Sequence, residues 1–172
     1  MNTPSGADNA SMTRVLVTGA DGFVGSNLRV AMRRTPGITI LPFDITQTPD
    51  ELDQYASVAD FVFHLAGVNR PKDPSEFISG NIELTARLLS TLTASGKQTP
   101  VVFSSSIQAD LDNPYGISKR RAEELLLDYH RNTGAPVRIF RFPNIFGKWS
   151  NPTRAPWNSP PNNEGPAPYD SG

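Results

Sequence analysis

Three glycines spaced three residues apart constrain the fold of this chain more than any other feature. They are Gly19, Gly22 and Gly25. A short apolar run rich in β-branched residues precedes them, and after them the apolar side chains recur with helical spacing. This change of period predicts a strand, a tight turn and a helix. Such a turn presents backbone N–H groups to a phosphate at the helix N-terminus.

Each glycine of such a turn has its own expected role. The first permits the turn, the second lets the backbone approach a pyrophosphate, and the third permits close packing of helix on strand. The spacing here is G-x-x-G-x-x-G rather than G-x-G-x-x-G. An ordinary strand–helix turn is therefore the alternative interpretation, although the strand before and the helix after favour nucleotide binding.

Composition narrows the class of protein. The 172 residues suffice for one domain with a sizeable core. A net charge of −1 argues against nucleic acid and acidic membranes as partners. The absence of cysteine excludes disulfides and thiolate metal sites. No apolar run is long enough to span a bilayer, and the first residues lack the pattern of a signal peptide. We therefore expect a cytoplasmic protein.

The rest of the chain alternates expected strands and helices. Strands are expected at about residues 15–18, 38–43, 60–67, 100–106 and 137–141, and helices at about 23–34, 51–57, 75–95 and 115–131. This alternation predicts an α/β fold, a right-handed, doubly wound parallel sheet of the Rossmann-like kind. His64 lies inside the third strand with no second ligand nearby, so we expect a packed core histidine rather than a metal ligand.

The two ends of the chain differ from its middle. Residues 1–12 are polar and are expected to form a disordered leader. Residues 13–149 form the expected nucleotide-binding domain. Residues 150–172 hold six of the sixteen prolines and few apolar side chains, so they are expected to form a disordered tail.

Asp44 ends the second expected strand, 25 residues after Gly19. An acid at this place is where an adenosine ribose needs a hydrogen-bond acceptor. Aspartates are also common at strand ends as turn residues or helix N-caps. Both interpretations stay open.

Tyr115 and Lys119 lie four residues apart at the start of a helix and therefore share one face. A free tyrosine has a pKa of about 10, and a nearby ammonium stabilises the phenolate and lowers that pKa. Such a pair can exchange a proton with an alkoxide that exchanges hydride with a nicotinamide. Three serines, 104–106, end the preceding strand, where a hydroxyl can donate to a reacting carbonyl. Open α/β sheets bind their ligands at this edge.

These motifs, in this order, resemble the extended short-chain dehydrogenases/reductases, the superfamily of nucleotide-sugar epimerases, dehydratases and reductases. The resemblance covers about residues 13–149. The motifs that carry it are Thr18-Gly-Ala-Asp-Gly-Phe-Val-Gly25, His64-Leu-Ala-Gly67, Ser104-Ser-Ser106, Tyr115-x-x-x-Lys119 and Arg141-Phe-Pro-Asn-Ile-Phe-Gly147. The segments 65–72, 104–109 and 112–116 more closely resemble the capsular polysaccharide biosynthesis reductases, which act on a UDP-linked 4-keto amino sugar.

The resemblance implies a set of cofactor contacts. Asp44 would lie near the adenosine half, and the other residues along the pyrophosphate or beside the dinucleotide. These are Gly19, Gly22, Phe23, Val24 and Gly25 at the pyrophosphate, Leu65, Ala66 and Gly67 beside the cofactor, and Pro143 at the nicotinamide. Reductases of this group typically use NADPH, whereas an acid at position 44 favours NAD. NADP(H) is therefore the expected cofactor and NAD(H) the alternative.

The resemblance also implies the catalytic roles. Ser106 would polarise the substrate carbonyl, with Ser105 as the alternative, and Tyr115 would supply the proton. Lys119 would hold the nicotinamide ribose and tune Tyr115, and Asn144 would border the sugar. Hydride would pass from the cofactor to C4 of the keto sugar.

The resemblance ends at about Trp149, where a complete member continues with a substrate-binding lobe. The expected function is thus reduction or epimerisation of a nucleotide-linked sugar, with a nucleotide sugar as partner and a homodimer formed through the helix of Tyr115 and Lys119. Two alternatives stay open: an NAD(P)-binding module without turnover, and a truncated, inactive product.

Overall fold

Five parallel strands form the single sheet of the computed structural model, which describes residues 12–145 and 147. The sheet order is β2-β1-β3-β4-β5. The strands are β1 (Thr13–Thr18), β2 (Ile38–Phe43), β3 (Phe61–His64), β4 (Val101–Ser106) and β5 (Val137–Phe142). The α/β class and the parallel sheet predicted from the sequence are confirmed.

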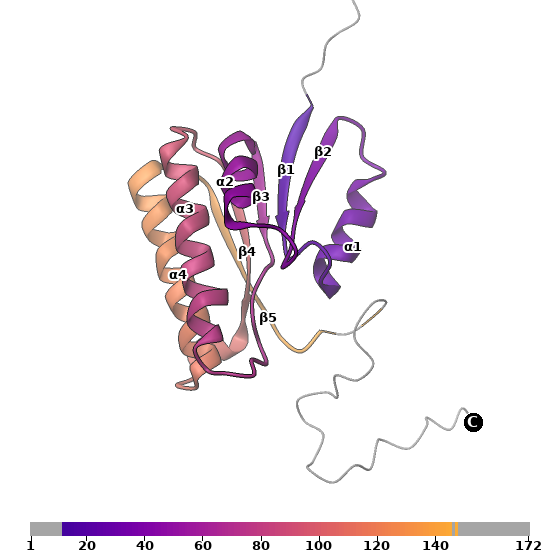
Figure 1. The fold of residues 1–172 in the computed structure, drawn as a ribbon. Coiled ribbons are helices and arrows are strands. Elements are labelled where there is room, and N and C mark those ends of the chain that lie inside the picture. Colours follow the sequence, from indigo (N-terminus) through magenta and orange to yellow (C-terminus); the bar gives the residue numbers. More distant parts are fainter. Residues whose placement is uncertain (1–11, 146, 148–172) are drawn as a thin grey trace, which may run out of the picture.

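Helices cover both faces of this sheet (Figure 1). Helix α1 lies on one side, and α2, α3 and α4 lie on the other. The chain runs outward from β1 to β2 and returns to β3 on the far side of β1, and right-handed crossovers then place the helices on opposite faces. The bounds are α1 (Phe23–Met32), α2 (Pro49–Val58), α3 (Leu84–Ala94) and α4 (Pro114–Thr133), with a π-helix η1 (Ile78–Glu83) and a 3-10 helix η2 (Ile107–Asp110).

Two apolar clusters follow from the alternation of side chains along the strands. The larger one lies between the sheet and α2, α3 and α4, and includes Leu16 and Phe103. The smaller one lies under α1 and includes Val15, Val17 and Met32. The sheet is thus packed against helices on both of its faces.

Local capping signals explain where two helices begin. Thr48 and Glu51 form a capping box before α2, with Pro49 at the first helical position. The Asn113 side chain accepts from the Gly116 N–H at the start of α4. Both helices begin slightly earlier than the apolar spacing predicts, at Pro49 and Pro114, because the first turn of a helix tolerates proline.

One difference from the sequence-based expectation concerns residues 75–95. The expected single helix is a π-helix, η1, followed by α3. Within η1, Asn81 is buried, and its side chain pairs with the backbone of Val68 in the loop after β3. The wider turn of the π-helix thus interrupts the regular α-helix and allows the Asn81 side chain to bond to that loop.

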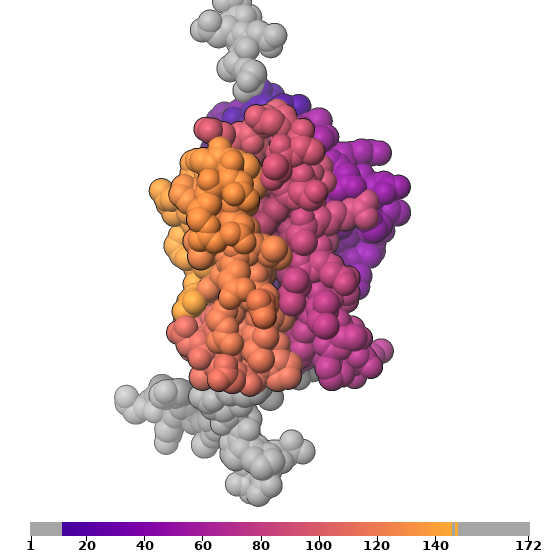
Figure 2. Space-filling model, turned by 90° about the vertical axis from the view of Figure 1, so that its left-hand side faces the viewer, coloured from indigo at the N-terminus to yellow at the C-terminus, as the bar shows by residue number. Residues whose placement is uncertain are grey.

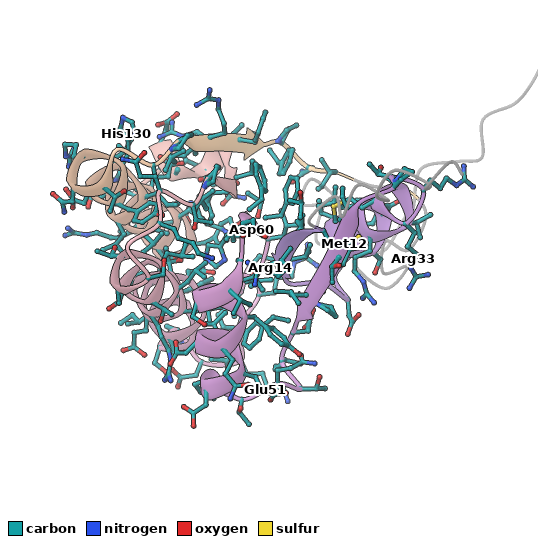
Figure 3. All side chains as sticks on the ribbon, turned by 90° about the horizontal axis from the view of Figure 1, so that it is seen from above. Met12, Arg14, Arg33, Glu51, Asp60 and His130 are labelled. Carbon is teal, nitrogen blue, oxygen red and sulfur yellow. The ribbon has the colours of Figure 1, made fainter. Side chains whose placement is uncertain are left out.

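An ion pair joins two strands at the edge remote from their carboxyl ends. Arg14 on β1 and Asp60 just before β3 lie beside each other (Figure 3). Asp60 accepts from the Arg14 backbone N–H at 2.9 Å and from its guanidinium at 3.1 and 3.0 Å. These bonds hold the pKa of Asp60 down, to about 2.

The outer surface includes a helical face (Figure 2) and an exposed aromatic side chain on the edge strand. Helices α3 and α4 lie side by side on one face (Figure 2). The homodimer that the resemblance implies, through α4 and its neighbouring helix, stays a prediction. Phe140 on the edge strand β5 is 52% exposed. Among residues 12–145 and 147, no helix is long and apolar enough to cross a membrane. The predicted tail, 150–172, and all but the last residue of the predicted leader, 1–12, lie outside the described residues.

Candidate active site

The candidate site lies where the carboxyl ends of β1, β3 and β4 meet. The chain leaves β1 toward β2 and later returns beyond β1 as β3, so the strand order reverses between β1 and β3. Open α/β sheets bind ligands in the crevice at such a reversal. The glycine turn, the end of β3 and the serines of β4 all lie at this edge.

The glycine turn fits tightly between α1 and the end of β3. Gly19 has a φ of +68°, and a Cβ atom there would lie 2.7 Å from the Ala66 nitrogen. A Cβ atom at Gly25 would lie 2.1 Å from the Gly19 carbonyl oxygen. The predicted turn role of Gly19 and packing role of Gly25 are confirmed. Gly22 is the N-cap of α1, which begins at Phe23; its approach to a pyrophosphate stays a prediction, as do the contacts of Phe23 and Val24.

Asp44 lies beside the glycine turn. Its carboxylate accepts from the Asp21 N–H at 2.7 Å and from the Ile45 N–H at 2.8 Å. It thus acts as a turn residue, while the N-cap of α2 is Thr48. An open groove of about 210 Å³ adjoins it, lined by Ala20, Asp21, Arg29, Pro42, Asp44 and Gln47. The contact of Asp44 with an adenosine ribose stays a prediction.

His64 joins β1 to α3 through a directed chain of hydrogen bonds. Its Nδ1 lies 2.7 Å from Thr18 Oγ1, and its Nε2 lies 2.8 Å from Thr85 Oγ1. Because Thr85 donates its hydroxyl proton to the Asn81 carbonyl, it accepts from His64, whose proton must therefore reside on Nε2. Burial lowers the pKa of His64 to about 3. The expectation of a satisfied core histidine is confirmed.

Two polar side chains, Asn81 and Lys119, converge on Gly67. A Cβ atom there would lie 2.8 Å from Asn81 Oδ1 and 2.9 Å from Lys119 Nζ. The Asn81 amide also donates to Ser118 Oγ at 2.9 Å. Position 67 therefore has room for glycine only while these two side chains keep their places. Leu65 and Ala66 connect this point to β1, since the Leu65 N–H donates to the Thr18 carbonyl at 3.1 Å.

Lys119 is buried among polar and aromatic groups. Its ammonium donates to the Ser104 carbonyl at 3.0 Å and lies 4.8 Å from the centroid of the Phe103 ring. Burial lowers the pKa of Lys119 to about 8, and the Glu123 carboxylate opposes this shift. Lys119 is thus an ammonium near neutral pH that titrates within reach of physiological conditions.

Tyr115 differs from the expectation in the direction of its pKa. Burial raises the pKa of Tyr115, and the Ser106 hydroxyl partly offsets this by hydrogen bonding to the phenol. The sequence predicts a lowered value from Lys119. That prediction is wrong for this state of the chain, because desolvation outweighs the other influences and the Lys119 ammonium is directed at the Ser104 carbonyl.

The structure distinguishes the two candidate serines. Ser106 is the hydroxyl that meets Tyr115, and it also accepts from the Gln108 N–H at 3.2 Å. Ser105 donates to the Glu123 carboxylate instead. Of the two, Ser106 therefore belongs to the Tyr115 side of the site. Pro143 and Asn144 follow β5 directly, beyond the point where Phe142 pairs with Ser106; their contacts to nicotinamide and sugar stay predictions.

Sequence reasoning misses two polar residues that the structure brings to the site, Asn81 and Glu123. Both are buried. A polar residue at an inward position of an otherwise apolar helical pattern is the signal that points to each. In the part of the chain that the structure describes, no cluster of three or more histidine, aspartate or glutamate side chains is arranged to hold a metal ion.

Comparison with known proteins agrees with this geometry. The profile of the NAD dependent epimerase/dehydratase family matches residues 15–158. The chain is 50% identical over 139 residues to UDP-2-acetamido-2,6-beta-L-arabino-hexul-4-ose reductase of Pseudomonas aeruginosa, covering 81% of this chain and 37% of that protein. It is 32% identical over 162 residues to GDP-6-deoxy-D-mannose reductase of the same species, covering 78% of this chain and 53% of that protein.

A solved structure shows the same likeness. The capsular polysaccharide assembling protein CapF from Staphylococcus aureus superposes with a TM-score of 0.71 at 43% identity. The match covers 84% of this chain and 38% of that protein. The chain thus spans between about a third and a half of the length of these relatives.

Proposed function

The chain belongs to the NAD dependent epimerase/dehydratase family, and from this premise we propose that it carries the cofactor and catalytic site of an NAD(P)-dependent reductase. Its proposed substrate is a UDP-linked 4-keto sugar used in making a capsule or another surface polysaccharide. The observation that carries the proposal is that β4, which ends at Ser106, and the start of α4, which bears Tyr115 and Lys119, lie at the sheet edge that also holds the glycine turn, with the Lys119 ammonium donating to the Ser104 carbonyl. The chain's similarity to a UDP-sugar reductase and to a capsular polysaccharide assembling protein supports the proposal.

The residues present fit a dinucleotide. Gly19 and Gly67 bring bare backbone to the end of β3, because a Cβ atom would clash with the Ala66 backbone at the first and with side chains at the second. The N-cap of α1 at Gly22 presents backbone N–H groups toward a phosphate. When bound, the nicotinamide supplies a hydride to the substrate carbonyl carbon.

The chain's own groups balance the charge of that transfer. As the carbonyl carbon gains the hydride, its π electron pair moves to oxygen, and the Ser106 hydroxyl donates a hydrogen bond to that oxygen. Tyr115 then gives its phenolic proton to the oxygen and becomes a phenolate. The Lys119 ammonium, which donates to the Ser104 carbonyl, would hold the nicotinamide ribose. The raised pKa of Tyr115 keeps it protonated, as a proton donor must be.

Two observations favour different cofactors. The resemblance to the capsule reductases favours NADP(H). The Asp44 carboxylate beside the ribose groove favours NAD(H), because it would repel a 2′-phosphate and accept from a 2′-hydroxyl. Each cofactor is therefore an arm of the experiment.

The test is reduction of a UDP-linked 4-keto sugar by the purified chain with NADPH or NADH. Deuterium placed on the nicotinamide should appear at C4 of the product sugar. Tyr115→Phe should lose at least about 100-fold in rate, as expected for removal of a general acid, while still binding the cofactor. Cofactor binding without turnover by the unaltered chain would favour the binding-module alternative. No binding of either cofactor would refute the proposal.

A further inference from the structure

Glu123 is a buried carboxylate outside the Ser106, Tyr115 and Lys119 set. It lies on α4, one helical turn after Lys119, and its side chain is 9% exposed. Its Oε1 accepts from the Ser105 hydroxyl and from Arg141 Nε, the latter at 2.9 Å, and its Oε2 accepts from Arg141 Nη2 at 2.7 Å. A carboxylate is retained at such a depth only when its charge is compensated.

These three bonds join the catalytic helix to the two strands beside it. Ser105 is the penultimate residue of β4, and Arg141 is its partner in register on β5. Arg141 also reaches Asp110 of η2 at 2.6 Å. The next residue after Ser105 is Ser106, and Pro143 and Asn144 follow Arg141 after the last residue of β5, Phe142. Glu123 therefore fixes the strand ends from which the site is built.

Glu123 lies four residues after Lys119 on α4, so the two side chains share one helix face, and the Glu123 carboxylate raises the pKa of Lys119 against the effect of burial. The polar and titratable groups that face the Lys119 ammonium are His64 of β3, Asn81 of η1, the Ser104 carbonyl of β4, and Glu123 on its own helix. Burial holds His64 neutral, with a pKa of about 3. Glu123 is thus the only anion in this set.

We propose that Glu123 is a positioning residue that keeps the buried Lys119 side chain charged while it ties α4 to the ends of β4 and β5. Arg141 sets the strength of this effect, because it shares the carboxylate and neutralises part of its charge. The consequence for turnover rests on the proposed function, whereas the effect on the Lys119 charge does not. A merely structural clamp would move the fold's stability and leave the titration of Lys119 alone.

The experiment measures the titration of Lys119 by NMR on the chain labelled in its lysines. The chain has four lysines, Lys72, Lys97, Lys119 and Lys148, and the signal lost in Lys119→Arg assigns the buried one. In the unaltered chain we expect burial to lower the pKa of Lys119 to about 8. Glu123→Gln should lower this pKa by about one unit, because removal of an anion leaves the desolvation unopposed.

Arg141→Met should shift the same pKa in the opposite direction. It retains an apolar stem of similar length and leaves Lys119 as the buried cation that compensates the Glu123 charge, so the pKa of Lys119 should rise. Glu124→Gln is the matched control, since this neighbouring carboxylate is exposed and pairs with Arg121. It should leave the Lys119 titration unchanged.

The proposal requires that the two substitutions shift the pKa of Lys119 in opposite directions. If Glu123→Gln and Arg141→Met both leave the Lys119 titration unchanged, or shift it in the same direction, the proposal is overturned. If Glu123→Gln does not fold, the direction of the shift in Arg141→Met decides alone. Binding of NADH and NADPH to the same samples is measured separately. Opposite shifts without cofactor binding would support this inference and refute the proposed function.

Discussion

Gly25→Ala tests the packing of α1 on the glycine turn, which positions the whole nucleotide edge. The new Cβ atom would lie 2.1 Å from the Gly19 carbonyl oxygen and 2.9 Å from the Ala20 backbone. Relief of the first contact requires a movement of about 1 Å between helix and turn. Overpacking of this kind costs about 3 kcal/mol, and alanine returns about 1 kcal/mol through its helix propensity. We therefore expect a net loss of about 2 kcal/mol.

Thermal and urea unfolding of the purified chain measure this loss. A loss of about 2 kcal/mol lowers the thermal midpoint by about 6–8 °C for a domain of this size. Gly96→Ala is the control, because its φ is +69° but nothing lies within 4 Å of the added Cβ atom. It should cost only about 1 kcal/mol of backbone strain. If Gly25→Ala loses no more than Gly96→Ala, or is more stable than the unaltered chain, the reasoning is refuted.

Three further predictions follow from the ionised and packed groups. Arg14 holds the pKa of Asp60 at about 2, below its unfolded value of 3.8. The stability that the pair contributes is therefore present above about pH 4 and is lost as pH falls toward 2. In Asp60→Asn, the free energy of unfolding measured in urea should no longer depend on pH over that window. His64 has a folded pKa of about 3 against 6.5 unfolded, so the free energy of unfolding should fall as pH falls from 6.5 to 3, and His64→Gln should remove that slope; NMR of the ring should show the proton on Nε2 at neutral pH. Gly67→Ala should displace the Lys119 ammonium and reduce the rise of the thermal midpoint with cofactor, and an undiminished rise would count against that placement.

Much of the fold is predictable because its signals are local. The apolar runs and the breaks between them predict all five strands, and the second expected strand agrees with β2 residue for residue. The π-helix η1 is not predictable in this way. Its geometry depends on the contact between Asn81 and Val68, 13 residues apart, and helical spacing alone contains no information about that contact.

In the candidate site too, local features are predictable from the sequence, whereas features that depend on the fold are not. The spacing of Tyr115 and Lys119 is visible in the sequence, and so is the serine-rich end of β4. The direction of the Tyr115 pKa is not, since it depends on how deeply the fold buries the phenol. The pairing of Glu123 with Arg141 joins residues 18 apart, and it exists only after β5 has added to the sheet beside β4.

The most direct test of the account is a thermal melt of the purified chain with and without NADH, and then NADPH. A ligand that binds only the folded state raises the thermal midpoint. At a concentration 100 times its Kd, it adds about 2.7 kcal/mol to the free energy of unfolding. We expect a clear rise with at least one cofactor and a smaller rise in Gly67→Ala. A cooperative transition that responds to neither cofactor would contradict the claim that this sheet edge is a dinucleotide site.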